Sequence, residues 1–278
     1  MFYIIIFIPF IEFKIIIIKI NKNIIYTRNY IDTVNTISPI TSQFIFENKD
    51  GQVKLRGNNE SGNCLFLLNA PKENLNFTGD EDNESKLCFL DFTKFFKLYK
   101  EFDKPNDDKT KEEHAVLDIE VNDNLNEAVV MNVKSNKSPC NFKYRLANTD
   151  VIKKPIIKEN PKLPEFVASI NLSKEMVNVI MHRISMIDAN YVTFELNEKT
   201  CKFIGKNNIT NQEYSEEIAL DTEVDKPLKV TIKAEAFTLL PTADYLVNFS
   251  EQFLTRFEQQ RADGIDLTLF LTAVKSEN

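Results

Sequence analysis

The sequence repeats itself at an offset of 148 residues. Residues 44–47 (Phe-Ile-Phe-Glu) correspond to 192–195 (Val-Thr-Phe-Glu), and residues 53–59 (Val-Lys-Leu-Arg-Gly-Asn-Asn) correspond to 201–207 (Cys-Lys-Phe-Ile-Gly-Lys-Asn). Each copy alternates apolar and polar residues on both sides of a polar turn, at 48–52 and at 197–200, which predicts two strands joined by that turn. An internal repeat constrains the architecture more than any single motif, and this one indicates two similar units.

A helical pattern precedes each copy of the repeat. In the second copy Ser173 can cap a helix that has an apolar and a polar face. The apolar face is Met176, Val177, Ile180, Ile184 and Ile187, and the polar face is Lys174, Asn178, His182 and Ser185. In the first copy the apolar residues are Tyr30, Val34 and Ile37, and the polar ones are Arg28, Asp32 and Asn35. Each unit is therefore expected to begin with helix, strand, turn and strand.

Each unit also contains a second helical pattern, followed by more strands. In the first unit an aromatic stripe marks the helix: Phe92, Phe95, Phe96, Tyr99 and Phe102. The matching segment of the second unit, residues 234–240, ends at Pro241, as helices commonly do before proline. Later strands are expected at 117–121, 129–133 and 142–146, and at 245–249, 253–257 and 267–274.

A proline-containing stretch separates the two units. Residues 148–165 contain Pro155, Pro161 and Pro164, which favour an extended connector. We therefore predict an α+β chain with one domain at residues 22–147, a connector at 148–165 and a second domain at 166–278.

The N-terminal residues 1–21 form an apolar extension that we leave out of the fold prediction. Residues 1–26 consist almost entirely of Phe, Tyr, Ile, Lys and Asn, the residue types that codons of A and T alone can specify. A mis-assigned start, a membrane anchor and an extra strand or arm are the open interpretations. Glu12 and Lys14 argue against a membrane span, because each charge near the centre of such a helix costs about 2.5–3.5 kcal/mol. The extension also lacks the basic stretch and small-residue cleavage site of a signal peptide.

Charge and cysteine content limit the function and the compartment. The net charge of -7 excludes attraction to a phosphate backbone as a property of the whole chain, so any DNA contact must come from local basic residues. The four cysteines are Cys64, Cys88, Cys140 and Cys201. Their wide spacing fits neither a zinc site nor a dense disulfide framework, and indicates a reducing, cytosol-like compartment.

Three segments of the second unit resemble T-even-type bacteriophage sliding clamps, relatives of the eukaryotic PCNA ring. Residues 163–170 (Leu-Pro-Glu-Phe-Val-Ala-Ser-Ile) resemble the start of the phage clamps' second domain. Residues 228–232 and 241–247 resemble a later strand, helix, proline and strand passage, and residues 267–275 resemble the closing strand. The resemblance extends from about residue 23 to the C-terminus and is strongest after residue 163. The order of two helix-and-strand units around an extended connector supports it.

This resemblance implies a DNA polymerase processivity factor without enzymatic activity or cofactor. In this family three two-domain chains close into a ring, with helices inside, sheets outside and duplex DNA held by topology. Lys94, Lys97 and Lys100 lie away from the aromatic stripe at about 100° per residue and are the main expected phosphate contacts. Weaker candidates on the other helices are Arg28, Lys174, His182, Arg183 and Lys233. The alternative interpretation of all these residues is an ordinary solvated helix face.

The expected partners follow from the same resemblance. They are double-stranded DNA, a DNA polymerase, an ATP-driven clamp loader, late-transcription factors and two further copies of the chain, in the cytoplasm of an infected host cell. Clamp partners dock short apolar peptides, and Val151, Ile152, Ile156 and Ile157 of the connector are candidates for that contact. These four residues could instead pack the connector onto the sheets.

The sequence contains none of the common catalytic motifs. It has no glycine-rich phosphate loop, GxSxG, HExxH or paired-cysteine metal site, and His114 and His182 are its two histidines. Competing interpretations are a strand-rich viral structural or scaffold protein and a membrane-anchored, clamp-like protein. A nuclease is a more distant one, since scattered carboxylates could form a metal site.

Overall fold

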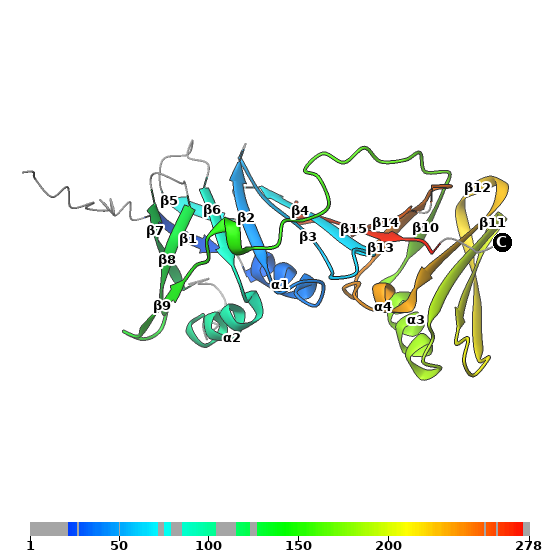
Figure 1. Ribbon diagram of the computed structural model, residues 1–278, viewed down its shortest axis with the longest axis horizontal. Coiled ribbons are helices and arrows are strands. Elements are labelled where there is room, and N and C mark those ends of the chain that lie inside the picture. Colours follow the sequence, from blue (N-terminus) through cyan, green and yellow to red (C-terminus); the bar gives the residue numbers. More distant parts are fainter. Residues whose placement is uncertain are drawn as a thin grey trace, which may run out of the picture.

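The computed structural model of the chain describes residues 22–26, 28–49, 51–71, 75–78, 85–103, 115–122, 127–252, 254–259 and 261–274. The extension at 1–21, residues 79–84 and residues 104–114, which include His114, lie outside the described residues. The described part forms two units that lie side by side along the long axis of the molecule (Figure 1).

Unit 1 combines two helices with a set of strands. The helices are α1 (Arg28–Ile37) and α2 (Phe92–Phe102). The strands are β1 (Lys22–Tyr26), β2 (Phe44–Lys49), β3 (Gln52–Asn58), β4 (Cys64–Pro71), β5 (Leu75–Thr78), β6 (Ser85–Phe89), β7 (Val116–Asn122), β8 (Glu127–Lys134) and β9 (Asn141–Arg145). Gly51, with a φ of 72°, lies in the turn between β2 and β3, where glycine meets no steric penalty.

Unit 2 repeats this order with longer strands and a shorter second helix. Its helices are α3 (Lys174–Met186) and α4 (Ala234–Phe237). Its strands are β10 (Ala168–Leu172), β11 (Tyr191–Lys206), β12 (Glu213–Lys233), β13 (Tyr245–Phe249), β14 (Leu254–Gln259) and β15 (Asp266–Thr272). The short 3-10 helix η2 (Thr149–Val151) follows unit 1 in the chain, at the start of the connector.

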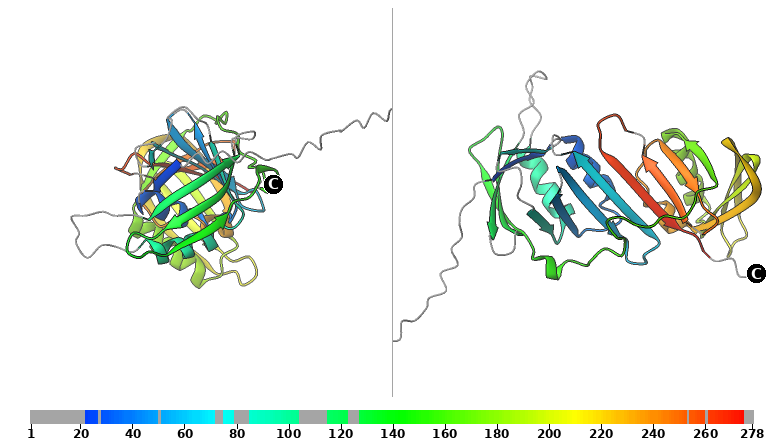
Figure 2. Two further views of the ribbon diagram at one scale, coloured as in Figure 1. Left: turned by 90° about the vertical axis from the view of Figure 1, so that its left-hand side faces the viewer. Right: turned by 90° about the horizontal axis from the view of Figure 1, so that it is seen from above.

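One sheet runs through both units. Its strand order is β10-β13-β14-β15-β4-β3-β2-β6-β8-β7-β1-β5, with β9 on β8, while β11 and β12 pair separately. The units meet where β15 pairs with β4 in antiparallel register, with Leu269 opposite Phe66. The right-hand view of Figure 2 shows the strands of both units following one another along the molecule. We call the β15–β4 pair the seam.

The pairing of the strands confirms that the sequence repeat is a structural repeat. In unit 1, Val53 lies opposite Ala70 and Gly57 lies opposite Phe66. In unit 2, Cys201 lies opposite Ile218 and Gly205 opposite Tyr214, so both members of each pair are displaced by the same 148 residues. The second half of β12 pairs with the first half of β11, as β6 pairs with β2.

The helices cover one face of the sheets, and the connector runs over the opposite face (Figure 1). Burial of aromatic rings attaches the helices of unit 1: Phe92 and Phe95 of α2 contact Phe89 of β6, with ring centroids 5.4 and 4.8 Å apart. In unit 2 the ring of Phe237 in α4 lies 6.3 Å from that of Phe194. Burying each such side chain stabilises the fold by about 1.5–3 kcal/mol.

Three sequence expectations need correction. The predicted second helix of unit 2 reaches only Phe237, because Thr238, Leu239 and Leu240 form a turn ahead of Pro241. The expected hairpin at residues 192–207 is assigned as the single strand β11, whose halves pair with opposite ends of β12. Register shifts and the positive φ of 38° at Glu198 mark the predicted turn. Residues 22–26, which share the AT-codon composition of the extension and were given no strand, form β1 between β5 and β7.

Candidate DNA-facing helices and connector surface

Helix α2 presents a row of lysines on the side away from the core. The Asp91 carboxylate caps the helix by accepting a hydrogen bond from the Lys94 backbone N–H at 2.9 Å, an arrangement typical of helix starts. Phe92, Phe95, Phe96 and Tyr99 are buried. Lys94, Lys97 and Lys100 are all exposed. The Lys100 ammonium lies 4.5 Å from the centroid of the Phe96 ring, which holds this charge close to the helix by a cation–π contact.

Helix α3 carries a weaker and more mixed set of charges. The Ser173 hydroxyl accepts a hydrogen bond from the Met176 backbone N–H at 3.2 Å, which confirms the predicted cap. Lys174, His182 and Arg183 are exposed, as is Glu175 in the first turn. The Arg183 guanidinium lies 5.3 Å from the ring centroid of Tyr214. This contact directs Arg183 toward strand β12.

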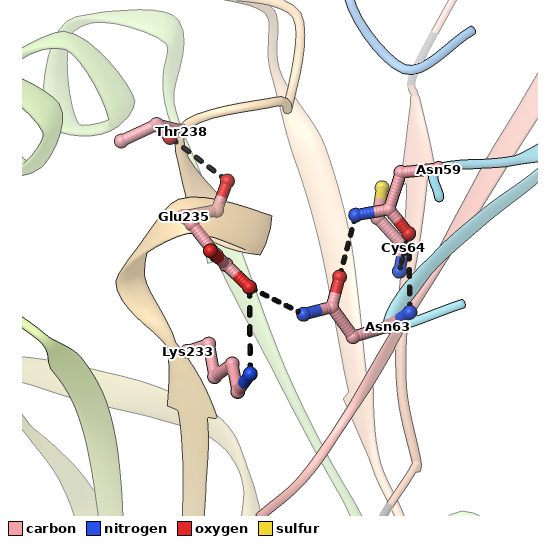
Figure 3. Close-up of polar contacts among 6 residues, drawn as sticks. All are labelled: Asn59, Asn63, Cys64, Lys233, Glu235 and Thr238. Carbon is pink, nitrogen blue, oxygen red and sulfur yellow. Dashed lines mark hydrogen bonds and ion pairs between the residues drawn. The ribbon is translucent and has the colours of Figure 1, made fainter. Parts of the chain in front are cut away.

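The remaining two helices contribute less positive charge. Arg28 begins α1, but its side chain lies outside the described part of the chain, and Asp32 is exposed on the same helix. Lys233 precedes α4, where its ammonium lies 3.5 Å from a Glu235 carboxylate oxygen (Figure 3). That carboxylate offsets the charge of Lys233. The structure therefore concentrates the predicted basic residues on α2 and, to a smaller extent, on α3.

Figure 3 shows the polar network that joins the units on the helix side of the seam. The Asn59 side-chain amide donates to Asn63 Oδ1 at 2.6 Å, and Asn63 Nδ2 donates to Glu235 Oε1 at 3.0 Å. The Asn63 carbonyl also accepts from the Thr272 N–H at 3.0 Å. Asn59 and Asn63 belong to unit 1, whereas Glu235 and Thr272 belong to unit 2. The network therefore fixes the relative orientation of the two units.

The connector divides its four isoleucine and valine candidates between two faces. Ile152 and Ile157 are buried and pack the connector onto the sheet, whereas Val151 and Ile156 are 61% and 65% exposed. Backbone N–H groups of Lys153 and Ile156 donate to the side-chain oxygens of Gln43 and Asn58, each at 2.9 Å. Only Val151 and Ile156 of the four are thus accessible to a partner.

The described side chains include four cysteine thiols and scattered carboxylates. The described residues contain no group of three or more His, Cys, Asp or Glu that could hold a metal ion. All four cysteines are free thiols, and burial raises the pKa of Cys64 and of Cys201 to about 12. These two thiols therefore stay protonated and unreactive. Among the described helices, none combines the length and the apolar character needed to cross a membrane.

Two repeated sheet-and-helix units in one chain, with the helices on one face, are the arrangement seen in the fold of sliding clamps. Solved structures bear this out. PCNA from Entamoeba histolytica matches with a TM-score of 0.69 and 17% identity, over 91% of this chain and 98% of that chain. PCNA from A. fulgidus, in a structure with the C-terminal region of FEN-1 bound, matches with a TM-score of 0.66 and 13% identity, over 92% and 100% of the chains.

A third match points to the same fold. The PCNA2–PCNA3 complex from Sulfolobus tokodaii gives a TM-score of 0.64 and 12% identity, over 91% of this chain and 98% of that chain. No protein-family model matches the sequence, and no curated protein matches it. At these identities the likeness is one of fold, so this chain has the PCNA-like clamp fold.

Proposed function

We propose that three copies of this chain close into a sliding clamp that encircles duplex DNA and acts as a processivity factor for a DNA polymerase. The observation that carries the proposal is that the edge strands at the two ends of the molecule correspond to the two strands of the internal seam. Strand β9 corresponds to β15, and the first part of β12 corresponds to β4. Each chain therefore offers, at its two ends, the two halves of a second seam.

The register of this second seam follows from the repeat. Within unit 2 a row of paired residues runs Ile170, Val247, Phe257 and Leu269, and ends opposite Phe66. In unit 1 the equivalent row runs Lys22, Ile119, Met131 and Tyr144. Tyr144 thus takes the place of Leu269, and Tyr214 takes the place of Phe66. Tyr144 of one copy is expected to lie opposite Tyr214 of the next, and Arg145 opposite Glu213.

The side chains along these two edges are complementary in charge. Lys143 and Arg145 are exposed on β9, whereas Glu213 and Glu217 are exposed on β12. With Arg145 opposite Glu213, Lys143 lies diagonally between Glu213 and Glu217, a separation that long side chains can span. Pairing of unlike edges in this way gives a head-to-tail interface, the type that forms a ring when the rotation between copies closes, and it leaves neither edge exposed.

Exposed apolar side chains gather at the same two ends. Leu90 and Leu98 lie next to or on α2, and Val179, Met186 and Ile209 belong to α3 and to the turn between β11 and β12. Met186 and Ile209 are 68% and 86% exposed. Apart from these residues, the large exposed hydrophobic side chains of the described chain lie on or beside the connector. Apolar surface at both ends favours contact with further copies.

The lysines of α2 support the interaction with DNA. In the proposed ring the helix-covered face lines the hole, where Lys94, Lys97 and Lys100 provide phosphate contacts, with Lys174, His182 and Arg183 adding to them. Such contacts position a protein on DNA without reading its sequence, as sliding requires. Arg28 and Lys233 also belong to this set, although Glu235 offsets the charge of Lys233.

The resemblance of residues 163–170 and 241–247 supports a more specific assignment, a ring of the T-even phage type. Its partners would be the viral DNA polymerase, an ATP-driven loader and late-transcription factors in the cytoplasm of the infected cell. Val151 and Ile156 are the connector residues open to such partners. We further propose that the ring itself has no enzymatic activity and needs no cofactor.

Charge reversal across the proposed seam tests the ring. Light scattering of the full chain at several concentrations should give a mass near three chains that falls on dilution. Arg145→Glu and Glu213→Arg should each shift the equilibrium toward the monomer, and the double variant should restore the native mass. Lys162→Glu, an exposed connector residue away from both edges, serves as the matched charge-reversal control. A native chain that stays monomeric at every concentration would overturn the proposal.

A further inference from the structure

A cavity lies beneath the start of the connector, on the sheet face opposite the helices. Its volume is ≈ 320 Å³, and it is lined by Ile45, Glu47, Arg56 and Lys86 of the sheet and by Thr149, Asp150, Lys154 and Pro155 of the connector. A second, smaller cavity of ≈ 20 Å³ shares Ile45, Arg56 and Pro155 with it. The two cavities are therefore neighbours along the connector.

The position of the connector above this cavity is fixed at several points. The Gln43 amide oxygen accepts a hydrogen bond from the Lys153 N–H, and Ile152 is buried beneath the chain. Further along, the Lys54 ammonium lies 3.1 Å from Glu159, and this hydrogen bond is the main cause that holds the pKa of the Glu159 carboxyl below its usual value. The cavity is therefore part of the folded chain and does not depend on ring formation.

Positive charge dominates the cavity, in a chain that is negative as a whole. Arg56, Lys86 and Lys154 contribute three cationic groups, against the carboxylates of Glu47 and Asp150. Glu47 is shared: its two oxygens lie 3.6 Å from an Arg56 nitrogen and 3.4 Å from the Lys86 ammonium. Both distances exceed those of a short charge-assisted hydrogen bond. The Glu47 carboxylate thus interacts weakly with two cations. Arg56 and Lys86 both retain N–H groups that can donate hydrogen bonds to another anion.

We propose that this cavity binds a carboxylate side chain from an acidic, partly apolar peptide segment of a partner protein. The excess of one positive charge suits a single carboxylate. The Arg56 guanidinium is planar, and its N–H groups can donate hydrogen bonds to both carboxylate oxygens. Ile45 and Pro155 line the same cavity, and Val151 and Ile156 expose apolar surface on the connector above it. An acidic residue flanked by apolar ones meets both features.

Nucleic acid fits this site less well than a peptide does. The connector covers the cavity, so a duplex would have to displace a segment that hydrogen bonds and Ile152 hold in place. Glu47 and Asp150 would also repel a chain of phosphates, which carries a charge at every nucleotide. The inference rests on the proposed docking of partners at the connector and specifies its chemistry, but it does not need the ring, because every residue of the site belongs to one chain.

Peptide binding to the full chain tests the site. The probes are a blocked Leu-Glu-Leu peptide and its Leu-Gln-Leu counterpart, titrated while amide signals of residues 149–156 are followed by NMR. We expect the acidic peptide to bind at least about tenfold more tightly, as contacts between charged groups allow, and the preference to weaken in salt. Lys154→Gln should reduce the preference several-fold, whereas Lys162→Gln, on the connector outside the cavity, should leave it unchanged.

Three results would overturn the inference. They are equal affinity for the two peptides, an unchanged preference in both Lys154→Gln and Arg56→Gln, and tighter binding of inorganic phosphate or of a single-stranded oligonucleotide at the same residues. Circular dichroism of the variants confirms that they are folded. A monomeric chain that still prefers the acidic peptide would keep this inference and reject the ring, so the two proposals fail separately.

Discussion

The two units of this chain have similar strand pairing but differ in their helices. Strand pairs β3–β4 and the matching parts of β11 and β12 keep the same register at an offset of 148 residues. By contrast, α2 has 11 residues and three exposed lysines, whereas α4 has 4 residues and follows a lysine paired with Glu235. The two units thus keep the same strand register, but the length of their second helix and the charge on its exposed side differ.

The largest expected effect tests whether the units behave as one folded body. Phe46 and Phe194 occupy equivalent positions, and both are fully buried among other rings. Phe46→Ala and Phe194→Ala should each lower the free energy of unfolding by about 3–5 kcal/mol through loss of burial and cavity formation. Because the seam joins the sheets, urea unfolding at fixed concentration should show one transition that either variant shifts.

Phe166→Ala provides the control for this pair. Phe166 is half-buried beside Arg256, whose guanidinium lies 4.3 Å from its ring centroid, so its loss should cost less than that of either core ring. Two separate transitions, with Phe194→Ala moving only one of them, would show that the units unfold independently and that the seam is weak.

Substitution of the equivalent glycines Gly57 and Gly205 should have a smaller effect on stability, and the effect should differ between the two units. A Cβ at Gly57 would lie 2.5 Å from Cε1 of the buried Phe66 ring, whereas at Gly205 it would lie 3.0 Å from Cγ2 of Ile184. Gly57→Ala should therefore destabilise the chain by about 1–3 kcal/mol, as overpacking does. Gly205→Ala should cost clearly less, because an aliphatic side chain can move aside more easily. Thermal unfolding of both variants measures the difference, and an equal or reversed order would contradict it.

Local patterns in the sequence were sufficient to predict the repeat, the cap at Ser173, the aromatic stripe of α2 and the extended connector. The cap, the stripe and the connector each depend on residues that are close together in the chain, and the repeat is found by comparing two such short segments. The seam was not predicted, because β4 pairs with β15 from the far end of the sequence. Residues 64–68 of β4 (Cys-Leu-Phe-Leu-Leu) also form an almost unbroken apolar run without the alternation expected of a strand.

The sequence also could not predict which side chains of the irregular connector face the sheet. Val151, Ile152, Ile156 and Ile157 are alike in composition, yet only hydrogen bonds from the connector to Gln43 and Asn58 decide which of them face the sheet. The cavity residues Arg56 and Lys86 were missed for a related reason. They come from different strands, and only the sheet register brings them to either side of Glu47.

The smallest expected effect concerns the difference in charge between helices α2 and α3. If α2 supplies most of the phosphate contacts, Lys97→Gln should reduce the slope of log affinity for a short duplex against log salt by about 0.9. Arg183→Gln on α3 should reduce it less, because its guanidinium lies over the Tyr214 ring. Lys202→Gln should leave the slope unchanged, since its neighbours Cys201 and Phe203 are buried and its side chain points to the other face of the sheet. Equal slopes for Lys97→Gln and Lys202→Gln would show that the α2 lysines are a solvated surface, and the DNA-facing role would then have to come from another element.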